Sequence, residues 1–274
     1  MKKPWILWTL AALITLLAAY YQRTTGPTYP RKINVEINGK TEKIKFPRSW
    51  AGEKDFKLEI NDIKGLTEAK VWFKRYPSND EFASLTMTKE DENLIAYLPL
   101  QPQAGKLAYY LELKSDKKSY FVAKEEPIVI RFRGDVPAGI MIAHIALIFL
   151  AMFFSNLAGL FVIARKKTYK LWGNIAFFVM LVGGMIFGPL MQKAAFGEYW
   201  TGFPNGMDLT DNKTLIAFVF WILAFALNIK KQRPVWVLVA SIVTIVIFSI
   251  PHSLLGSEYN YEANKVVTGF IGGF

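Results

Sequence analysis

Long uncharged apolar stretches constrain the fold of this chain more than any other feature of its sequence. A helix needs about 20 predominantly apolar residues to cross the hydrocarbon core of a membrane. Five segments without Asp, Glu, Lys or Arg approach that length, and four of them crowd the second half of the chain. We therefore predict an α-helical membrane bundle with five transmembrane helices, at residues 4–21, 136–164, 171–191, 215–229 and 235–250.

The basic residues beside these stretches predict an orientation, because cytoplasmic loops of membrane proteins carry an excess of Lys and Arg. The N-terminus and the loops after the second and fourth stretches hold nine of them: Lys2, Lys3, Arg165, Lys166, Lys167, Lys170, Lys230, Lys231 and Arg233. The loop at 192–213 and the C-terminal tail contain more acidic than basic residues. We expect a bacterial inner-membrane protein with a cytoplasmic N-terminus and an extracytoplasmic C-terminus.

The same basic residues account for the charge balance of the chain. A formal net charge of +11 by itself admits a nucleic-acid partner. Because membrane topology explains these charges, we predict contact with membrane lipid and no nucleic-acid partner. The chain contains no cysteine, which excludes a disulfide framework and a cysteine metal site.

The first apolar stretch has the basic start and apolar core of a signal peptide. Residues 18–23 lack a small-x-small cleavage site, and Tyr20 and Tyr21 suit a membrane interface. We therefore expect a retained anchor. The predicted organisation is an anchor and linker (1–30), an extracytoplasmic β domain (31–133), a four-helix transmembrane domain (134–256) and an extracytoplasmic tail (257–274).

Alternation of polar and apolar residues predicts strands throughout residues 31–133. Apolar residues alternate from Ile33 to Ile37, directly before Asn38-Gly39, a dipeptide typical of hairpin turns. Further β-rich runs lie at residues 56–60, 71–73, 107–113 and 128–130. About seven short strands separated by polar turns are typical of an antiparallel sandwich.

Part of this domain resembles a known module. Residues 85–87 read Leu-Thr-Met, residues 96–99 read Ala-Tyr-Leu-Pro, and residues 104–110 read Ala-Gly-Lys-Leu-Ala-Tyr-Tyr. A strand ending near a proline, then a glycine turn and a Tyr-Tyr strand, resembles exported fibronectin type III and immunoglobulin-like modules. The resemblance implies an all-β immunoglobulin-like sandwich; it does not imply an activity.

Two histidines, His144 and His252, fall in or next to expected spans. Ionisable side chains are costly in a membrane, so they indicate a functional site. Counting about 20 residues from the cytoplasmic end of each span places both histidines at the outer hydrocarbon boundary. The aromatic, glycine-rich loop at 196–214 lies at the same level, and we expect Asp211 to cap the helix that follows.

The segment Phe196-Gly197-Glu198-Tyr199-Trp200, with a histidine before and after it in the chain, resembles the haem-handling membrane proteins of cytochrome c maturation. In that family a tryptophan-rich outer loop covers a haem held by two histidines; here Phe203-Pro204 stands where the loop has Trp-Asp. The resemblance implies haem b ligated by His144 and His252 beneath Tyr199 and Trp200.

Other interpretations use the same residues. Gly183, Gly184 and Gly188 form a small-residue face that suits either a flat cofactor or close helix packing. Each histidine also suits an interfacial position bonded to backbone or to lipid headgroups. A zinc or copper site would combine the histidines with Glu258 or Asp208. A quinol site would combine a histidine with Glu198, Asp208 or Asp211.

Two functional hypotheses remain open. The sequence has no P-loop, dinucleotide-binding fingerprint, GxSxG, HExxH or CxxCH motif, and no charged residue in the middle of a span. We therefore do not expect a stand-alone enzyme, a primary transporter or a channel. The first hypothesis is a haem b protein for electron transfer or haem handling. The second is a non-catalytic membrane subunit whose sandwich docks an outer-face protein partner in a larger complex.

Overall fold

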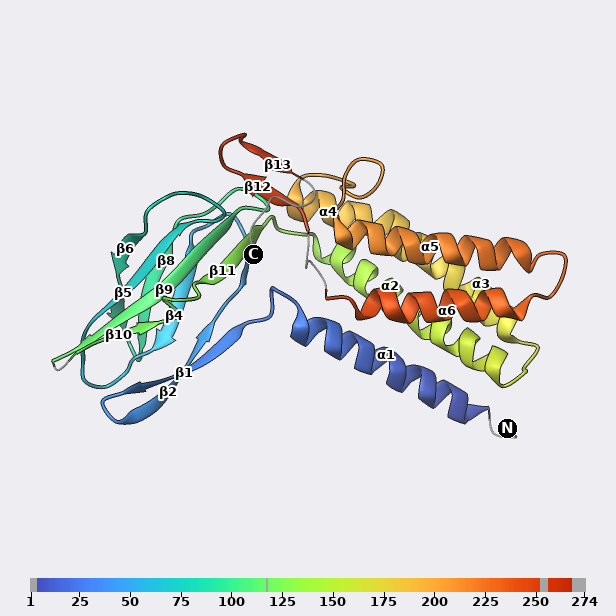
Figure 1. Ribbon diagram of the computed structural model, residues 1–274, viewed down its shortest axis with the longest axis horizontal. Coiled ribbons are helices and arrows are strands. Elements are labelled where there is room, and N and C mark those ends of the chain that lie inside the picture. The colour runs from blue at the N-terminus through green and yellow to red at the C-terminus, as the bar shows by residue number, and fades with distance from the viewer. Residues whose placement is uncertain (1–3, 117, 252–255, 268–274) are drawn as a thin grey trace. The chain divides into compact units, whose positions relative to one another are not determined.

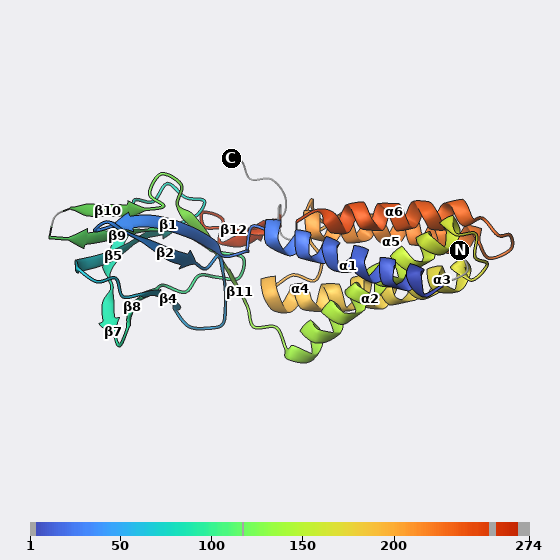
Figure 2. The ribbon, with the colours of Figure 1, turned by 90° about the horizontal axis from the view of Figure 1, so that it is seen from below.

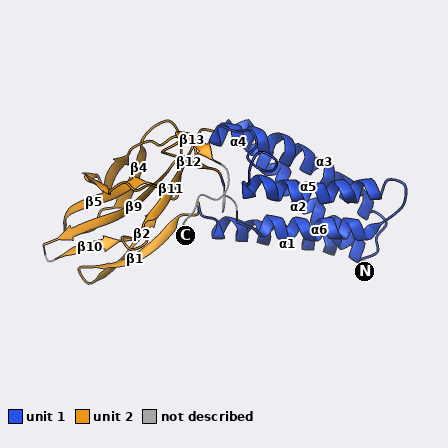
Figure 3. Ribbon diagram, turned by 45° about the horizontal axis from the view of Figure 1, so that its top comes forward, with its two compact units in different colours: residues 1–27, 136–256, 268–274 blue, residues 28–135, 257–267 orange. Residues whose placement is uncertain are grey.

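The computed structural model describes residues 4–116, 118–251 and 256–267. The chain separates into two compact units, coloured differently in Figure 3. Residues 28–135 and 257–267 form the β unit, and residues 1–27 and 136–256 belong to the helical unit.

The β unit begins with a hairpin whose turn sets its register. Strands β1 (Arg31–Ile37) and β2 (Lys40–Phe46) pair antiparallel, with Ile37 opposite Lys40. The turn residues have positive φ angles, 50° at Asn38 and 78° at Gly39, which match the right-handed twist of the flanking strands. The hairpin predicted from Asn-Gly is confirmed.

Two further sheets make up most of the β unit (Figures 1 and 2). The smaller has the order β4-β8-β7, with β4 at Phe56–Asn61, β7 at Thr88–Glu90 and β8 at Asn93–Leu98. The larger has the order β3-β11-β9-β5-β6, with β3 at Ser49–Ala51, β5 at Leu66–Arg75, β6 at Ala83–Thr86, β9 at Lys106–Ser115 and β11 at Ile128–Arg133.

Strand β10 (Ser119–Val122) extends the line of β11 along β9. It pairs with Leu111 to Lys114 of β9, and β11 pairs with Lys106 to Tyr109. Because β5 occupies the other edge of β9, β10 and β11 share one edge. Strand β3 lies beyond β11 and pairs with it in parallel.

Apolar residues of both sheets meet in one core. Leu58 and Leu98 from the smaller sheet and Val71 and Leu111 from the larger are fully buried in it. Strand β4 alternates buried and exposed residues, as expected when one face of a sheet is solvated. Strand β9, in the middle of its sheet, is buried from Leu107 to Leu113.

Residues after the last helix return to the β unit as a hairpin of β12 (Glu258–Asn260) and β13 (Lys265–Val267). The Tyr261 hydroxyl donates to Lys106 O at 2.8 Å and accepts from Lys106 N at 3.0 Å. Lys106 also forms an ion pair with Glu258. The structure therefore differs from the separate tail expected at 257–274, because contacts with distant residues attach 257–267 to the β unit.

The helical unit contains α1 (Trp5–Thr25), α2 (Ala138–Ile163), α5 (Leu209–Leu227) and α6 (Pro234–Ser249). Between α2 and α5 runs a continuous helical segment made of α3 (Tyr169–Met180), the π-helical η1 (Leu181–Phe187) and α4 (Gly188–Phe196). Of these, α1, α2, the 169–196 segment and α5 are long and apolar enough to cross a membrane, which indicates a membrane protein. Helix α6 is apolar but has 16 residues.

Hydrogen bonds between side chains and a contact between aromatic rings join the apolar helices. Asn156 Nδ2 of α2 donates to Thr15 Oγ1 of α1 at 2.9 Å, and Trp221 Nε1 of α5 donates to Thr244 Oγ1 of α6 at 2.9 Å. The ring of Trp8 in α1 packs against Trp172 in α3, with ring centroids 4.8 Å apart. Helix α1 is therefore a packed member of the helical unit.

Candidate functional site

His144 lies on α2 and contacts η1 through its ring. Its Nδ1 lies 2.9 Å from the carbonyl oxygen of Gly183. Because a carbonyl only accepts, Nδ1 carries the proton of the neutral ring, and Nε2 keeps its lone pair. Imidazoles that bind metals are oriented in this way. The other predicted ligand, His252, lies outside the described residues.

The backbone next to His252 in sequence is described up to Pro251. Ile250 ends α6, and its carbonyl oxygen accepts hydrogen bonds from Lys213 Nζ at 3.1 Å and from Gln22 Nε2 at 3.3 Å. Carbonyls in the last turn of a helix lack a partner within the helix, and a cation there also interacts favourably with the helix dipole. Lys213 thus serves as a cap for α6.

The glycine face, for which the sequence allowed either a flat cofactor or close helix packing, is covered by protein at Gly183 and Gly184. A Cβ placed on Gly183 would lie 2.6 Å from Leu147 Cβ, and one placed on Gly184 would lie 3.0 Å from Thr214 Cγ2. At Gly188 the neighbour is His144 itself, with Cε1 at 3.7 Å. A macrocycle does not fit over these glycines. The alternative, close packing of η1 against α2 and α5, agrees with these distances.

Tyr199 and Trp200 contact residues of their own loop and of α4. Trp200 Nε1 donates to Phe203 O at 2.9 Å, and the Lys193 ammonium lies 5.3 Å from the centre of the Tyr199 ring. His144 packs against Gly188, at the start of α4, whereas this loop follows the end of α4 at Phe196. Helix α4 has nine residues, so the rise from Gly188 to Phe196 is about 12 Å. The described contacts therefore do not bring Tyr199 or Trp200 to His144.

The loop is held by Asp211, in the first turn of α5. Its Oδ2 accepts hydrogen bonds from Thr201 N at 2.7 Å, Gly202 N at 3.1 Å, Thr201 Oγ1 at 3.1 Å and Gln192 Nε2 at 2.9 Å. The Asp211 residue is only 8% exposed. A buried carboxylate with several donors stays satisfied away from water, so Asp211 fixes the loop on α4 and α5.

The expected helix cap at Asp211 is wrong by three positions. The N-cap of α5 is Asp208, whose Oδ1 accepts from Thr210 N at 2.8 Å. Asp211 stands three residues later, where an acidic side chain usually reaches back to the cap. Here it reaches the preceding loop instead. The sequence did contain a signal for the observed helix start. Two acidic residues three positions apart, Asp208 and Asp211, favour an N-cap at the first of them.

Three of the four acidic residues proposed for metal or quinol sites have other partners in the structure; the fourth, Glu198, is exposed. Asp208 caps α5, Asp211 holds the loop, and Glu258 pairs with Lys106 in the β unit. Within residues 4–116, 118–251 and 256–267, no three His, Asp or Glu side chains group as metal ligands.

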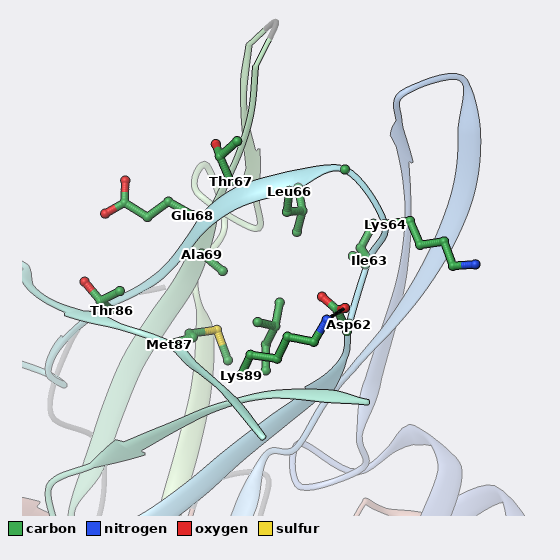
Figure 4. Close-up of a pocket in the computed structure, with 12 residues that line it drawn as sticks. Asp62, Ile63, Lys64, Leu66, Thr67, Glu68, Ala69, Thr86, Met87 and Lys89 are labelled. Atoms are coloured by element: carbon green, nitrogen blue, oxygen red, sulfur yellow. Dashed lines mark hydrogen bonds and ion pairs between the residues drawn. The ribbon is translucent and has the colours of Figure 1, made fainter. Parts of the chain in front are cut away.

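The β unit contains a cavity of about 460 Å³ that the sequence did not indicate (Figure 4). Figure 4 shows Leu66, Ala69 and Met87 pointing into the space, while Lys64 and Glu68 point away from it. Lys89 Nζ lies 2.5 Å from Asp62 Oδ2 beside the cavity. The cavity thus combines apolar side chains with polar residues, among them Thr67, Thr86 and the Asp62–Lys89 ion pair.

The cavity lies where the two sheets come apart. Met87 joins β6 to β7, so the chain crosses there from the larger sheet to the smaller, and Met87 N donates to Ala69 O at 2.8 Å. Both β6 and β7 are terminal strands of their sheets, and every residue in them is exposed. Thr86 of β6 and Lys89 of β7 line the cavity, and each of these strands has one edge that pairs with no other strand among the described residues.

The sequence matches no protein-family model and no curated protein.

Proposed function

We propose that the chain is a five-span inner-membrane protein with its N-terminus and basic loops in the cytoplasm and its β unit on the opposite side. Four helices long enough to span and the shorter apolar α6 support this number. Lys170 Nζ donates to Ile229 O at 3.4 Å, so the loops after α2 and α5 lie together. Both loops are basic, which favours one cytoplasmic face.

Cysteine labelling tests the proposed orientation, since the native chain has no cysteine. Lys43→Cys in the β1–β2 hairpin should react with a membrane-impermeant maleimide in intact spheroplasts. Lys231→Cys, after α5, should react only after permeabilisation. The reverse pattern would contradict the proposed topology.

The strand order supports an immunoglobulin-like sandwich for the β unit. Sheets β4-β8-β7 and β11-β9-β5-β6 correspond in order to strands B-E-D and G-F-C-C′ of such sandwiches. Strands β4 and β8 pair antiparallel, as do β5, β9 and β11. The architecture alone does not imply an activity, so the function has to be argued from its edges and cavities.

The function supported best is the docking of an extended segment of a partner protein on the β unit, within a membrane complex. The observation that supports this function is the cavity beside the unpaired edges of β6 and β7 in the described residues. Natural sheets usually block their edges with charged residues or proline. Strand β6, Ala83-Ser84-Leu85-Thr86, contains neither.

The residues at this edge indicate what kind of partner segment would bind there. Unpaired backbone groups of an edge strand recognise another extended chain, and a neighbouring pocket selects one of its side chains. The walls formed by Leu66, Ala69 and Met87 suit an apolar side chain. Because Asp62 and Lys89 neutralise each other beside the cavity, we expect an uncharged segment with one large apolar residue.

A displayed random-peptide library, selected on the full-length protein in nanodiscs, tests this function. Selected peptides should share a large apolar residue with uncharged neighbours. Leu85→Lys charges the edge and Ala69→Leu fills the cavity, so each should weaken binding by about tenfold or more. Tyr97→Lys, on an exposed position of the paired strand β8, is the matched control.

Two outcomes would contradict docking at this edge: a selection without enrichment, and peptides that bind wild type and Leu85→Lys equally. Thermal unfolding of each variant identifies a loss of folding. Leu85 is 37% exposed, so Leu85→Lys keeps the test valid even where Ala69→Leu unfolds the β unit.

Haem b at His144 remains a second candidate, supported by the orientation of its ring toward Gly183 O. Bound haem would supply one-electron chemistry, and His144, through its Nε2, and His252 would hold it. Protein produced with ample haem should then show haem bands in a reduced-minus-oxidised spectrum, and His144→Ala or His252→Ala should remove them. A spectrum without bands would contradict this candidate.

A further inference from the structure

Charges in the second part of the helical unit are strongly segregated. Between residues 136 and 256 the acidic residues are Glu198, Asp208 and Asp211, all between α4 and the first turn of α5. The connections α2–α3 and α5–α6, with the first turn of α3, hold seven basic residues that we name the basic collar: Arg165, Lys166, Lys167, Lys170, Lys230, Lys231 and Arg233.

Hydrogen bonds join the two halves of the basic collar. Tyr169 OH donates to Asn228 Oδ1 at 3.3 Å, and Lys170 Nζ donates to Ile229 O at 3.4 Å. Asn228 also donates to Arg233 O at 3.1 Å and accepts from Arg233 N at 2.8 Å. The two loops therefore lie together and carry the cations of the basic collar on one surface.

The cations of the basic collar have no carboxylate partner within the part of the chain that the structure describes. The ion pairs between described residues all lie in the β unit. Seven like charges on one surface repel one another and attract anions. An external anion would relieve this repulsion.

Exposed apolar side chains stand directly beside these cations. Ile163, two residues before Arg165, is 66% exposed, and Val235, two residues after Arg233, is 65% exposed. Leu171 follows Lys170 and is also exposed. A ligand that contacts both the cations and the exposed apolar side chains needs an anionic group next to a hydrocarbon chain. Phospholipids join an anionic phosphate to long acyl chains, whereas a small soluble anion such as inorganic phosphate has no hydrocarbon.

We propose that the basic collar binds anionic phospholipids, with Lys and Arg donors on the headgroup phosphate and acyl chains along the adjoining helix ends. Juxtamembrane Lys and Arg clusters attract anionic lipid in this way, and guanidinium and ammonium groups form charge-assisted bonds to phosphate. The site is independent of the docking function proposed for the β unit.

Lipid retention by the delipidated full-length protein tests the proposal. We would add phosphatidylglycerol or phosphatidylcholine in detergent and count bound lipids by native mass spectrometry. Phosphatidylglycerol should be retained preferentially. The collar variant Lys166→Gln, Lys167→Gln, Lys231→Gln should weaken that retention by about tenfold or more. It spares Lys170, Asn228 and Arg233, which join the loops.

The matched control is Lys40→Gln, Lys43→Gln, Lys45→Gln, which removes the same charge from exposed positions of the β1–β2 hairpin. It should retain phosphatidylglycerol like the wild type. Equal retention of both lipids, or equal loss in both triple variants, would overturn the proposal. Displacement of the lipid by millimolar inorganic phosphate would also overturn it, because the site would then recognise phosphate alone. Thermal unfolding confirms that each variant is folded.

Discussion

Asp211 Oδ2 accepts a hydrogen bond from the backbone N–H of Thr201 at 2.7 Å, ten positions away in the chain. This bond closes the loop between α4 and α5 into a defined shape. The neighbouring Asn212 adds a second closure, since its Oδ1 accepts from Phe203 N at 2.6 Å. The aromatic residues that the sequence predicted as a cofactor cover are thus held by the start of α5.

Asp211→Asn should destabilise the helical unit by about 2–3 kcal/mol, because a charged acceptor serving buried donors is lost. Denaturant unfolding of the purified protein measures this change, and limited proteolysis should detect faster cleavage near the loop. Glu198→Gln, at an exposed loop position, is the control and should leave both measurements unchanged. Equal effects of the two substitutions would show that the bonds at Asp211 do not hold the loop.

Gly202→Ala should destabilise the same loop by about 1–3 kcal/mol through overpacking. A Cβ at this position would lie 2.7 Å from Asp211 Cβ. Gly139→Ala is a matched control on α2, where a Cβ would meet no atom within 4 Å. Differential scanning fluorimetry should give a lower Tm for Gly202→Ala alone. A Tm unchanged from wild type would mean that the loop adjusts freely at Gly202.

Tyr261 should make the stability of the β unit depend on alkaline pH. Burial raises the pKa of Tyr261 from 10.0 to about 12. A raised folded-state pKa contributes stability that is complete below the unfolded pKa and is lost as the pH rises through the folded value. The stability advantage of wild type over Tyr261→Phe should therefore be largest below pH 10.0 and shrink toward pH 12.

Denaturant unfolding at a series of pH values measures that advantage. Tyr97→Phe, at a residue 51% exposed, is the control for the loss of a tyrosine hydroxyl from the surface of the β unit. A Tyr261→Phe difference that stays constant across this range would contradict burial of the hydroxyl in the C-terminal hairpin contact.

Thr15→Val should weaken the packing of α1 on α2 by about 0.6–1.7 kcal/mol, the range for hydrogen bonds between membrane helices. Thr15 Oγ1 accepts from Asn156 Nδ2, so valine leaves the buried amide without this partner. Unfolding in detergent measures the loss. Thr9→Val removes an exposed hydroxyl from the same helix and should cost less. In a double-mutant cycle with Asn156→Leu, a zero coupling energy would contradict the contact.

Features that depend on neighbouring residues could be predicted from the sequence. The apolar stretches predict helices that agree with the structure within a few residues, since length and composition decide whether a segment suits a membrane. Asn38-Gly39 predicts its hairpin because the turn needs two adjacent positive φ angles. The prediction that Asp211 caps the helix was also made from neighbouring residues, and it was wrong because α5 begins three residues earlier, with Asp208 as its N-cap.

The tertiary structure alone decided the features that join distant positions. Tyr261 meets Lys106 across 155 positions of the chain, and no local pattern identifies such a pair. The cavity arises because Met87 carries the chain from one sheet to the other beside Ala69. The sequence allowed either a cofactor or a neighbouring helix at Gly183 and Gly184, and the tertiary structure places Leu147 and Thr214 against them. Sequence determines which segments are apolar, alternating or basic, whereas contact between distant side chains exists only once those segments pack.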